Sequence, residues 1–115
     1  MKRDQKYTTK EKTSIYETTT PLLDSMYLEF KELSKKKPDA AVSKSKITIA
    51  NRLLTKVREV LADEDTVDFL DLLDEDDVPQ MSDVTLILSQ YVAMKKAFHN
   101  EYYGYNGSEH NWFLS

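Results

Sequence analysis

The chain has 115 residues, of which 31% are charged and 40% are hydrophobic, as is typical of one small domain with a modest core. It contains no cysteine, which excludes disulfide bonds, a thiol nucleophile and cysteine metal ligands. The net charge of −4 divides into +6 over residues 1–62 and −10 over residues 63–115, and this division indicates a charged partner.

Residues 1–19 are polar and charged with few large apolar side chains, and we predict that they form a mobile arm. Thr20 followed by Pro21 is typical of a helix start, because threonine accepts a hydrogen bond from a free N–H group and proline carries none. Apolar residues then recur at steps of three and four as far as Leu33, which predicts a helix over residues 21–36. Lysines at its end suit the helix dipole.

A second helix is predicted from about residue 43 to residue 62. Its apolar residues between Ile47 and Leu61 fall within an arc of roughly 160° when they are placed at 100° per residue. The linker between the two helices has about five residues, which favours an antiparallel helical hairpin.

Residues 63–79, the acidic segment, hold nine carboxylates. Five large apolar residues in the middle of this segment predict a short helix capped by Asp65 or Thr66. The carboxylates near its end oppose the helix dipole, so the helix is expected to end by about Leu73 or Asp74.

The last helix is predicted over residues 82–103, with Ser82 as its cap and Gly104 at its end. No charge occurs between Val84 and Met94, so this helix is expected to be central or covered by a partner. An aromatic tail follows it and is expected to pack either on the bundle or on a partner.

The predicted fold class is therefore all-α: a small helical bundle of three main helices plus a short acidic helix, built on the antiparallel hairpin. The bundle domain spans residues 20–104, between the arm (1–19) and the tail (105–115). No apolar run reaches the ~20 residues that cross a membrane, and the first residues lack the apolar stretch of a secretory signal. A cytoplasmic location is expected.

The sequence carries no catalytic signature. The only glycines, Gly104 and Gly107, lie near the end, which excludes a glycine-rich phosphate loop from residues 1–103. His99 and His110 are the only histidines, and their spacing matches no familiar metal-ligand motif. We therefore expect no catalysis, no metal and no cofactor. A third hypothesis, an enzyme or ion binder that uses the acidic segment, predicts that a divalent cation raises the melting temperature.

The predicted function is a non-enzymatic protein–protein interaction module, such as an adaptor, a small subunit or a regulator. It would act through a charged surface and an apolar helix face, on another protein or on a second copy. The acidic residues predicted to meet the partner are Asp71, Asp74, Glu75, Asp76 and Asp77, the first three on one helical face. The apolar and aromatic residues predicted to do so are Tyr91, Phe98, Tyr102, Trp112 and Phe113. The carboxylates also fit a merely solvated surface or a mimic of nucleic-acid phosphates.

The alternative is a nucleic-acid-binding regulator that uses the basic face of the first two helices. Its candidate residues are Lys35, Lys36, Lys37, Lys44, Arg52 and Lys56. Lysines dominate this face and no aromatic residues lie among them for stacking on bases, so binding would be salt-sensitive and weakly sequence-selective. No membrane partner is expected.

Overall fold

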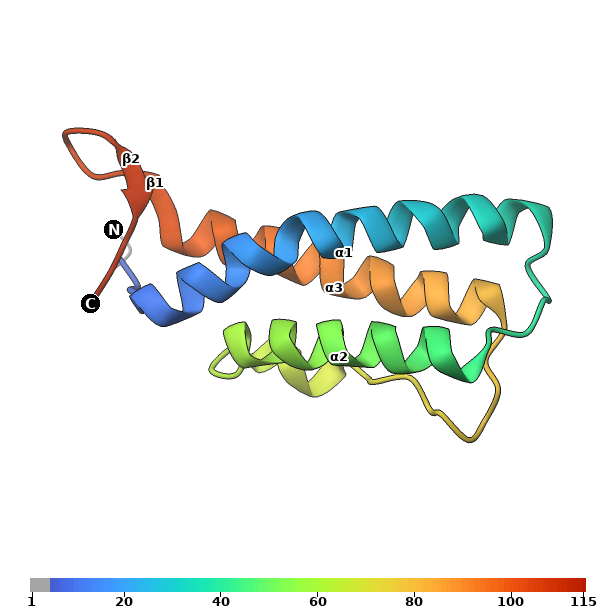
Figure 1. Ribbon diagram of the computed structural model, residues 1–115. Coiled ribbons are helices and arrows are strands. Elements are labelled where there is room, and N and C mark those ends of the chain that lie inside the picture. The colour runs from blue at the N-terminus through green and yellow to red at the C-terminus, as the bar shows by residue number, and fades with distance from the viewer. Residues whose placement is uncertain (1–4) are drawn as a thin grey trace.

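The computed structural model describes residues 5–115, which form three long helices. They are α1 (Lys10–Lys36), α2 (Lys44–Val60) and α3 (Met81–Tyr102). Figure 1 shows α2 running back alongside α1, with α3 packed against both. The predicted helical bundle is confirmed at this level, and α3 begins within one residue of its predicted start. None of the helices in residues 5–115 is long and apolar enough to cross a membrane.

The first helix begins at Lys10, well before the predicted start at Thr20. Thr9 is its N-cap, and the Thr9 side chain accepts a hydrogen bond from the backbone N–H of Lys12 at 3.2 Å. The prediction that residues 1–19 form a mobile arm is therefore wrong for residues 10–19, which are helical, whereas residues 1–4 lie outside the described part of the chain.

Pro21 lies inside α1 rather than at its first position. Proline lacks an N–H group and its ring crowds the preceding turn, so a proline inside a helix bends it. The three threonines before it donate their hydroxyl hydrogens to carbonyl oxygens four residues back, at 2.7 to 3.0 Å, a pattern that also bends helices. Figure 1 shows that α1 changes direction along its length.

The residues at the centre of each predicted apolar stripe are buried in the core. Its largest fully buried side chains include Leu23 of α1, Leu54 of α2, and Leu88 and Tyr91 of α3. Two residues that the stripes also included, Leu22 and Ile49, are instead 56% and 55% exposed. Each lies at the edge of its stripe, where the neighbouring helices do not cover it.

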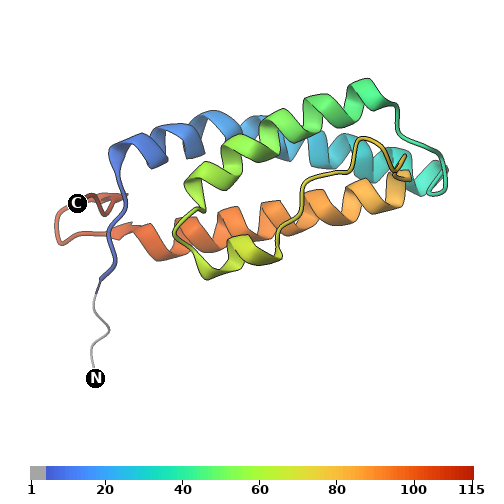
Figure 2. The same cartoon turned by 90° about the horizontal axis from the view of Figure 1, so that it is seen from below.

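The acidic segment contains η1 (Asp65–Phe69), a single 3-10 helix, and then continues without regular structure, through a bend at residues 75–77, to α3. The predicted helix as far as Leu73 is wrong, because Leu70 and Leu73 enter the core from this irregular chain. The Asn51 side chain of α2 replaces the helical hydrogen bonds by donating to the Leu73 carbonyl and accepting from the Leu73 N–H, both at 2.8 Å. Figure 2 shows this stretch running between α2 and α3.

The C-terminal residues form a short hairpin on the bundle. The strands β1 (Tyr103–Tyr105) and β2 (His110–Trp112) pair in antiparallel register, so Gly104 lies in a strand rather than directly ending α3. Beyond the hairpin, the N–H of Thr8 donates to the carbonyl of Phe113, and the N–H of Ser115 donates to the carbonyl of Thr8, both at 2.9 Å. The tail therefore packs on the bundle, which is one of the two predicted outcomes.

Candidate functional site

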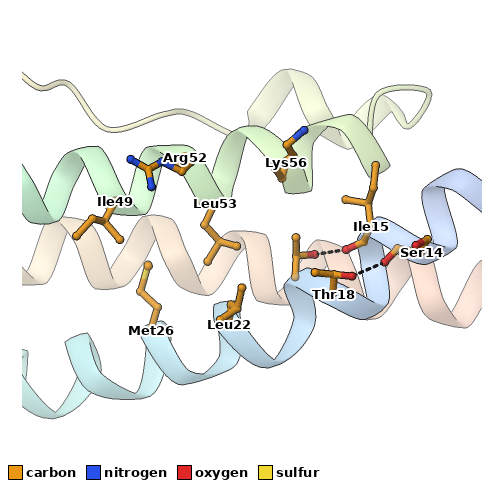
Figure 3. Close-up of a pocket in the computed structure, with 10 residues that line it drawn as sticks. Ser14, Ile15, Thr18, Leu22, Met26, Ile49, Arg52, Leu53 and Lys56 are labelled. Carbon is orange, nitrogen blue, oxygen red and sulfur yellow. Dashed lines mark hydrogen bonds between the residues drawn. The ribbon is translucent and has the colours of Figure 1, made fainter.

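One hollow of the protein is a groove between α1 and α2, with α3 behind it (Figure 3). It has a volume of about 520 Å³, and its apolar lining comes from both helices: Ile15, Leu22, Met26, Ile49 and Leu53. Figure 3 shows the side chains of Leu22 and Met26 reaching from α1 towards those of Ile49 and Leu53 on α2. We call this hollow and its continuation the α1–α2 groove.

The groove continues towards the other end of α1. A second hollow of about 270 Å³ shares Leu22, Met26 and Ile49 with the first and extends to Leu33. The lining residues of α1 therefore run from Ser14 to Leu33, which is about 28 Å of helix at 1.5 Å per residue. An open apolar trough of this length matches an elongated ligand better than a compact one.

The rim of the groove is basic. Three exposed cations of α2 line it, Lys46, Arg52 and Lys56, against one carboxylate from α1, Glu29. Lys56 is also 3.5 Å from the carboxylate of Glu59 on the following turn, an exposed pair that contributes little to stability. The groove thus combines an apolar floor with a positive edge.

Other hollows on the surface differ from this one. Two of those that border the acidic segment are more polar, and Asp63, Glu64, Asp65, Asp71, Asp74, Asp77 and Asp83 are among the residues that line them. A third, of about 340 Å³, is apolar and has Phe69, Leu70 and Met94 in its lining. Within residues 5–115, no group of three or more histidine or carboxylate side chains is placed to hold a metal ion.

The predicted acidic residues do not share a helical face. Asp71, Asp74, Glu75, Asp76 and Asp77 lie on the irregular stretch after η1, the last three in a bend, and all five are exposed. Their backbone and side chains still make contacts with the bundle. The carbonyl of Asp71 accepts from the Tyr91 hydroxyl at 3.0 Å, and the carboxylate of Glu75 accepts from the Thr48 hydroxyl at 3.3 Å.

The predicted aromatic residues belong mainly to the core. Tyr91, Phe98 and Tyr102 are buried, so they present no face to a partner. Trp112 is half-buried beside Tyr16, at 5.1 Å between ring centres, and its indole N–H donates to the carboxylate of Glu17 at 2.9 Å. Phe113 is half-buried too and lies against Gly104, where a side chain would approach its ring to about 3.3 Å.

The predicted basic residues separate into two groups. Lys35, Lys36 and Lys37 lie at the end of α1, and Lys44 opens α2. Arg52 and Lys56 lie further along α2, on the rim of the groove. The structure therefore brings only the second group to the apolar hollow.

Sequence reasoning missed a buried cation. Lys95 of α3 is only 3% exposed, and its ammonium group donates to the carbonyl of Tyr16 at 3.0 Å and to the hydroxyl of Thr19 at 2.8 Å. Burial lowers the pKa of Lys95 from 10.5 to about 8, although the carboxylate of Asp24 opposes this shift. The sequence contains one signal of this burial: Lys95 lies seven positions after Leu88, which places it on the same, buried side of α3.

Sequence reasoning also missed the α1–α2 groove itself. Leu22 and Ile49 were grouped with the core because they follow the helical period. Their position at the edge of wide stripes was the available signal, since such stripes exceed what one neighbouring helix covers.

No protein-family model, curated protein or solved structure matches this chain.

Proposed function

We propose that the protein is a non-enzymatic interaction module whose α1–α2 groove binds an acidic amphipathic helix of a partner protein. The observation that supports this most is the exposure of Leu22 and Ile49 on the two walls of an apolar trough. Contiguous exposed apolar surface on a small protein is typical of a binding site. We infer further that α1 and α2 act as an antiparallel hairpin that holds the two walls.

The length of the groove favours a helix as its occupant. A helix lying along it would place apolar side chains at i, i+3, i+4 and i+7 on the groove floor, as in other helix-in-groove complexes. Such a helix would complete a four-helix arrangement around α1 and α2. It would cover Leu22 and Ile49, which the chain itself leaves in water.

The charge of the groove favours an acidic occupant. Its rim carries three cations and one carboxylate, so carboxylates beside the apolar anchors of the partner would speed association and fix its orientation. On another side of α2 the chain packs its own acidic segment, through apolar side chains and hydrogen bonds to the backbone. There the acidic segment inserts Leu70 and Leu73 and is held by Asn51 and by the guanidinium of Arg58, which donates to the Leu70 carbonyl.

The test uses two labelled synthetic peptides. One is an amphipathic helix with leucine at i, i+3, i+4 and i+7 and glutamate on its flanks, and the other has lysine in place of each glutamate. We expect the acidic peptide to bind in fluorescence anisotropy and the basic peptide to bind at least about tenfold more weakly.

Matched variants locate the binding site. Ile49→Asp should abolish binding and Arg52→Glu should weaken it, whereas Leu86→Asp should leave it unchanged because Leu86 is an equally exposed leucine of α3 that does not line the groove. Equal binding of both peptides, or unchanged binding by Ile49→Asp, would contradict the proposal.

Nucleic-acid binding by the basic face makes a different prediction. Replacement of Lys35, Lys36 and Lys37 by alanine would reduce binding to nucleic acid and flatten its salt dependence. The same replacement should leave peptide binding in the groove unchanged, because none of these lysines lines it.

A further inference from the structure

We propose that the acidic segment of a second copy of this chain occupies the α1–α2 groove, with Phe69 and Leu72 as its apolar anchors. This inference rests on the groove and the charge preference of the proposed function, and it names as occupant the 3-10 turn of the acidic segment and the chain that follows it, in place of an amphipathic helix. It predicts self-association in which each copy offers its groove to one neighbour and its acidic segment to another.

The acidic segment has an inward and an outward side. Leu70 and Leu73 point into the core, whereas Phe69 is 80% exposed and Leu72 is 44% exposed. The side chain of Phe69 is the most exposed of the large apolar side chains in residues 5–115. A phenylalanine this exposed is costly to keep in water and is typical of an anchor that a partner buries.

The outward side also has the charge that the groove requires. Asp68 and Asp71 flank the two anchors and are exposed, and the whole acidic segment carries nine carboxylates and no cation. The groove presents Lys46, Arg52 and Lys56 along its rim. The two surfaces therefore match in apolar content and are opposite in charge.

A single copy cannot make this contact with itself. The acidic segment packs along α2 and α3, held there by Asn51 and by the Tyr91 hydroxyl, whereas the groove lies between α1 and α2. The contact is therefore heterologous: one copy contributes its segment and the other its groove. Such a contact leaves a free segment and a free groove on every pair, so it builds a ring or an open chain of copies.

The first measurement is the mass of the full chain by light scattering from about 5 to 500 µM protein, at about 50 mM and 500 mM salt. We expect the mean mass to rise with concentration beyond that of a dimer and the association to weaken by about tenfold or more at high salt. A monomer at every concentration would overturn the inference. If such a monomer still binds the acidic peptide, the proposed function stands and only the self-association is refuted. If the monomer does not bind the acidic peptide, the proposed function and the inference both fail.

Two exposed substitutions separate the two surfaces. Ile49→Asp places a charge in the groove and leaves the acidic segment intact. Phe69→Asp replaces the apolar anchor of the acidic segment and leaves the groove intact. Each side chain is mostly in water, so both variants should fold like the wild type, as circular dichroism would verify. Each variant alone should be monomeric, whereas Leu86→Asp should associate like the wild type.

Mixing the two variants is the decisive step. The intact segment of the Ile49→Asp chain fits the intact groove of the Phe69→Asp chain, so an equimolar mixture should give a 1:1 dimer that grows no further. A mixture that stays monomeric would contradict a heterologous contact between these surfaces. Self-association that persists in either variant alone would show that another surface holds the copies together and would overturn the inference.

Discussion

The ammonium group of Lys95 lies 4.4 Å from the centre of the Tyr16 ring and donates a hydrogen bond to the carbonyl oxygen of the same residue. The cation thus contacts both the π face and the backbone of one residue on the neighbouring helix. That carbonyl also accepts from the hydroxyl of Thr20, one residue before Pro21. Lys95 therefore ties α3 to the bent part of α1.

The lowered pKa of Lys95 makes stability depend on pH. In the unfolded chain the amine keeps its proton up to its ordinary pKa of 10.5, whereas in the fold it loses the proton near pH 8. Between these values the unfolded state binds more protons, so the free energy of unfolding rises with pH. From pH 7.5 to 9.5 the gain from this residue is about 2 kcal/mol.

Urea unfolding of the wild type and of Lys95→Met across this range measures that gain. The difference in unfolding free energy between the two proteins should change by this amount, because methionine does not titrate. Lys96→Met, at the exposed neighbouring position, is the control and should keep the pH dependence of the wild type. A constant difference between wild type and Lys95→Met would refute the prediction.

Asn51 is predicted to be the main polar anchor of the acidic segment. Asn51→Ala removes two hydrogen bonds and leaves the N–H and carbonyl of the largely buried Leu73 without partners. We expect a loss of about 2–3 kcal/mol in the free energy of unfolding, with faster amide hydrogen exchange over residues 70–78. Thr55→Ala is the matched control on the same helix, because the Thr55 hydroxyl bonds only within α2, and it should cost well under half as much.

Tyr102 is predicted to ionise late. Burial raises the pKa of this phenol to about 12, and its hydrogen bond to the carboxylate of Glu64 adds to the shift. Since the folded pKa exceeds the ordinary value of 10, the contribution of this group to stability is complete below pH 10 and is lost as the pH rises towards 12. In an absorbance titration, Tyr102→Phe should remove the last tyrosine step and lower stability at pH 7 by about 1 kcal/mol. An unchanged final step would assign it to another tyrosine.

Trp112 is predicted to hold the first turns of α1. Its ring packs on Tyr16 and its N–H bonds Glu17, so Trp112→Ala should cost about 2–3 kcal/mol and raise hydrogen exchange over residues 10–17. Tyr105→Ala, a mostly exposed aromatic on the same hairpin, should change neither quantity by much. Equal effects of the two substitutions would mean that the hairpin, rather than the Trp112 contact, secures this end of α1.

The helical period predicted the bundle well because burial of the stripe centres decides where helices pack. Pro21 misled the prediction of the first helix, since proline favours a first turn but is also tolerated where threonine hydroxyls and a neighbouring cation occupy nearby carbonyls. The real start depended on Thr9, a cap that the polar composition around it concealed. The first part of α1 is stabilised by the contact between Tyr16 and Trp112, and no local sequence pattern reveals a contact between residues so far apart in the chain.

The candidate site was less predictable than the fold. Leu70 and Leu73 are spaced as in a helix, yet neither lies in an α-helix. The Asn51 side chain bonds the backbone of Leu73, and the Arg58 guanidinium donates to the Leu70 carbonyl. The charge of Arg52 and Lys56 predicts a basic surface, whereas the ligand proposed for them depends on the apolar trough beside them. That trough exists because α1 and α2 come together in space, and its facing residues Leu22 and Ile49 are 27 positions apart in the chain.

The pairing of Thr8 with Phe113 and Ser115 constrains how the protein is made. A ribosome that adds about 5–20 residues per second produces Ser115 roughly 5 to 20 s after Thr8. During that interval the backbone groups of Thr8 lack their partners Phe113 and Ser115, and the first turns of α1 lack Trp112. The end of the bundle that carries both of these contacts is therefore completed only after synthesis has passed residue 115.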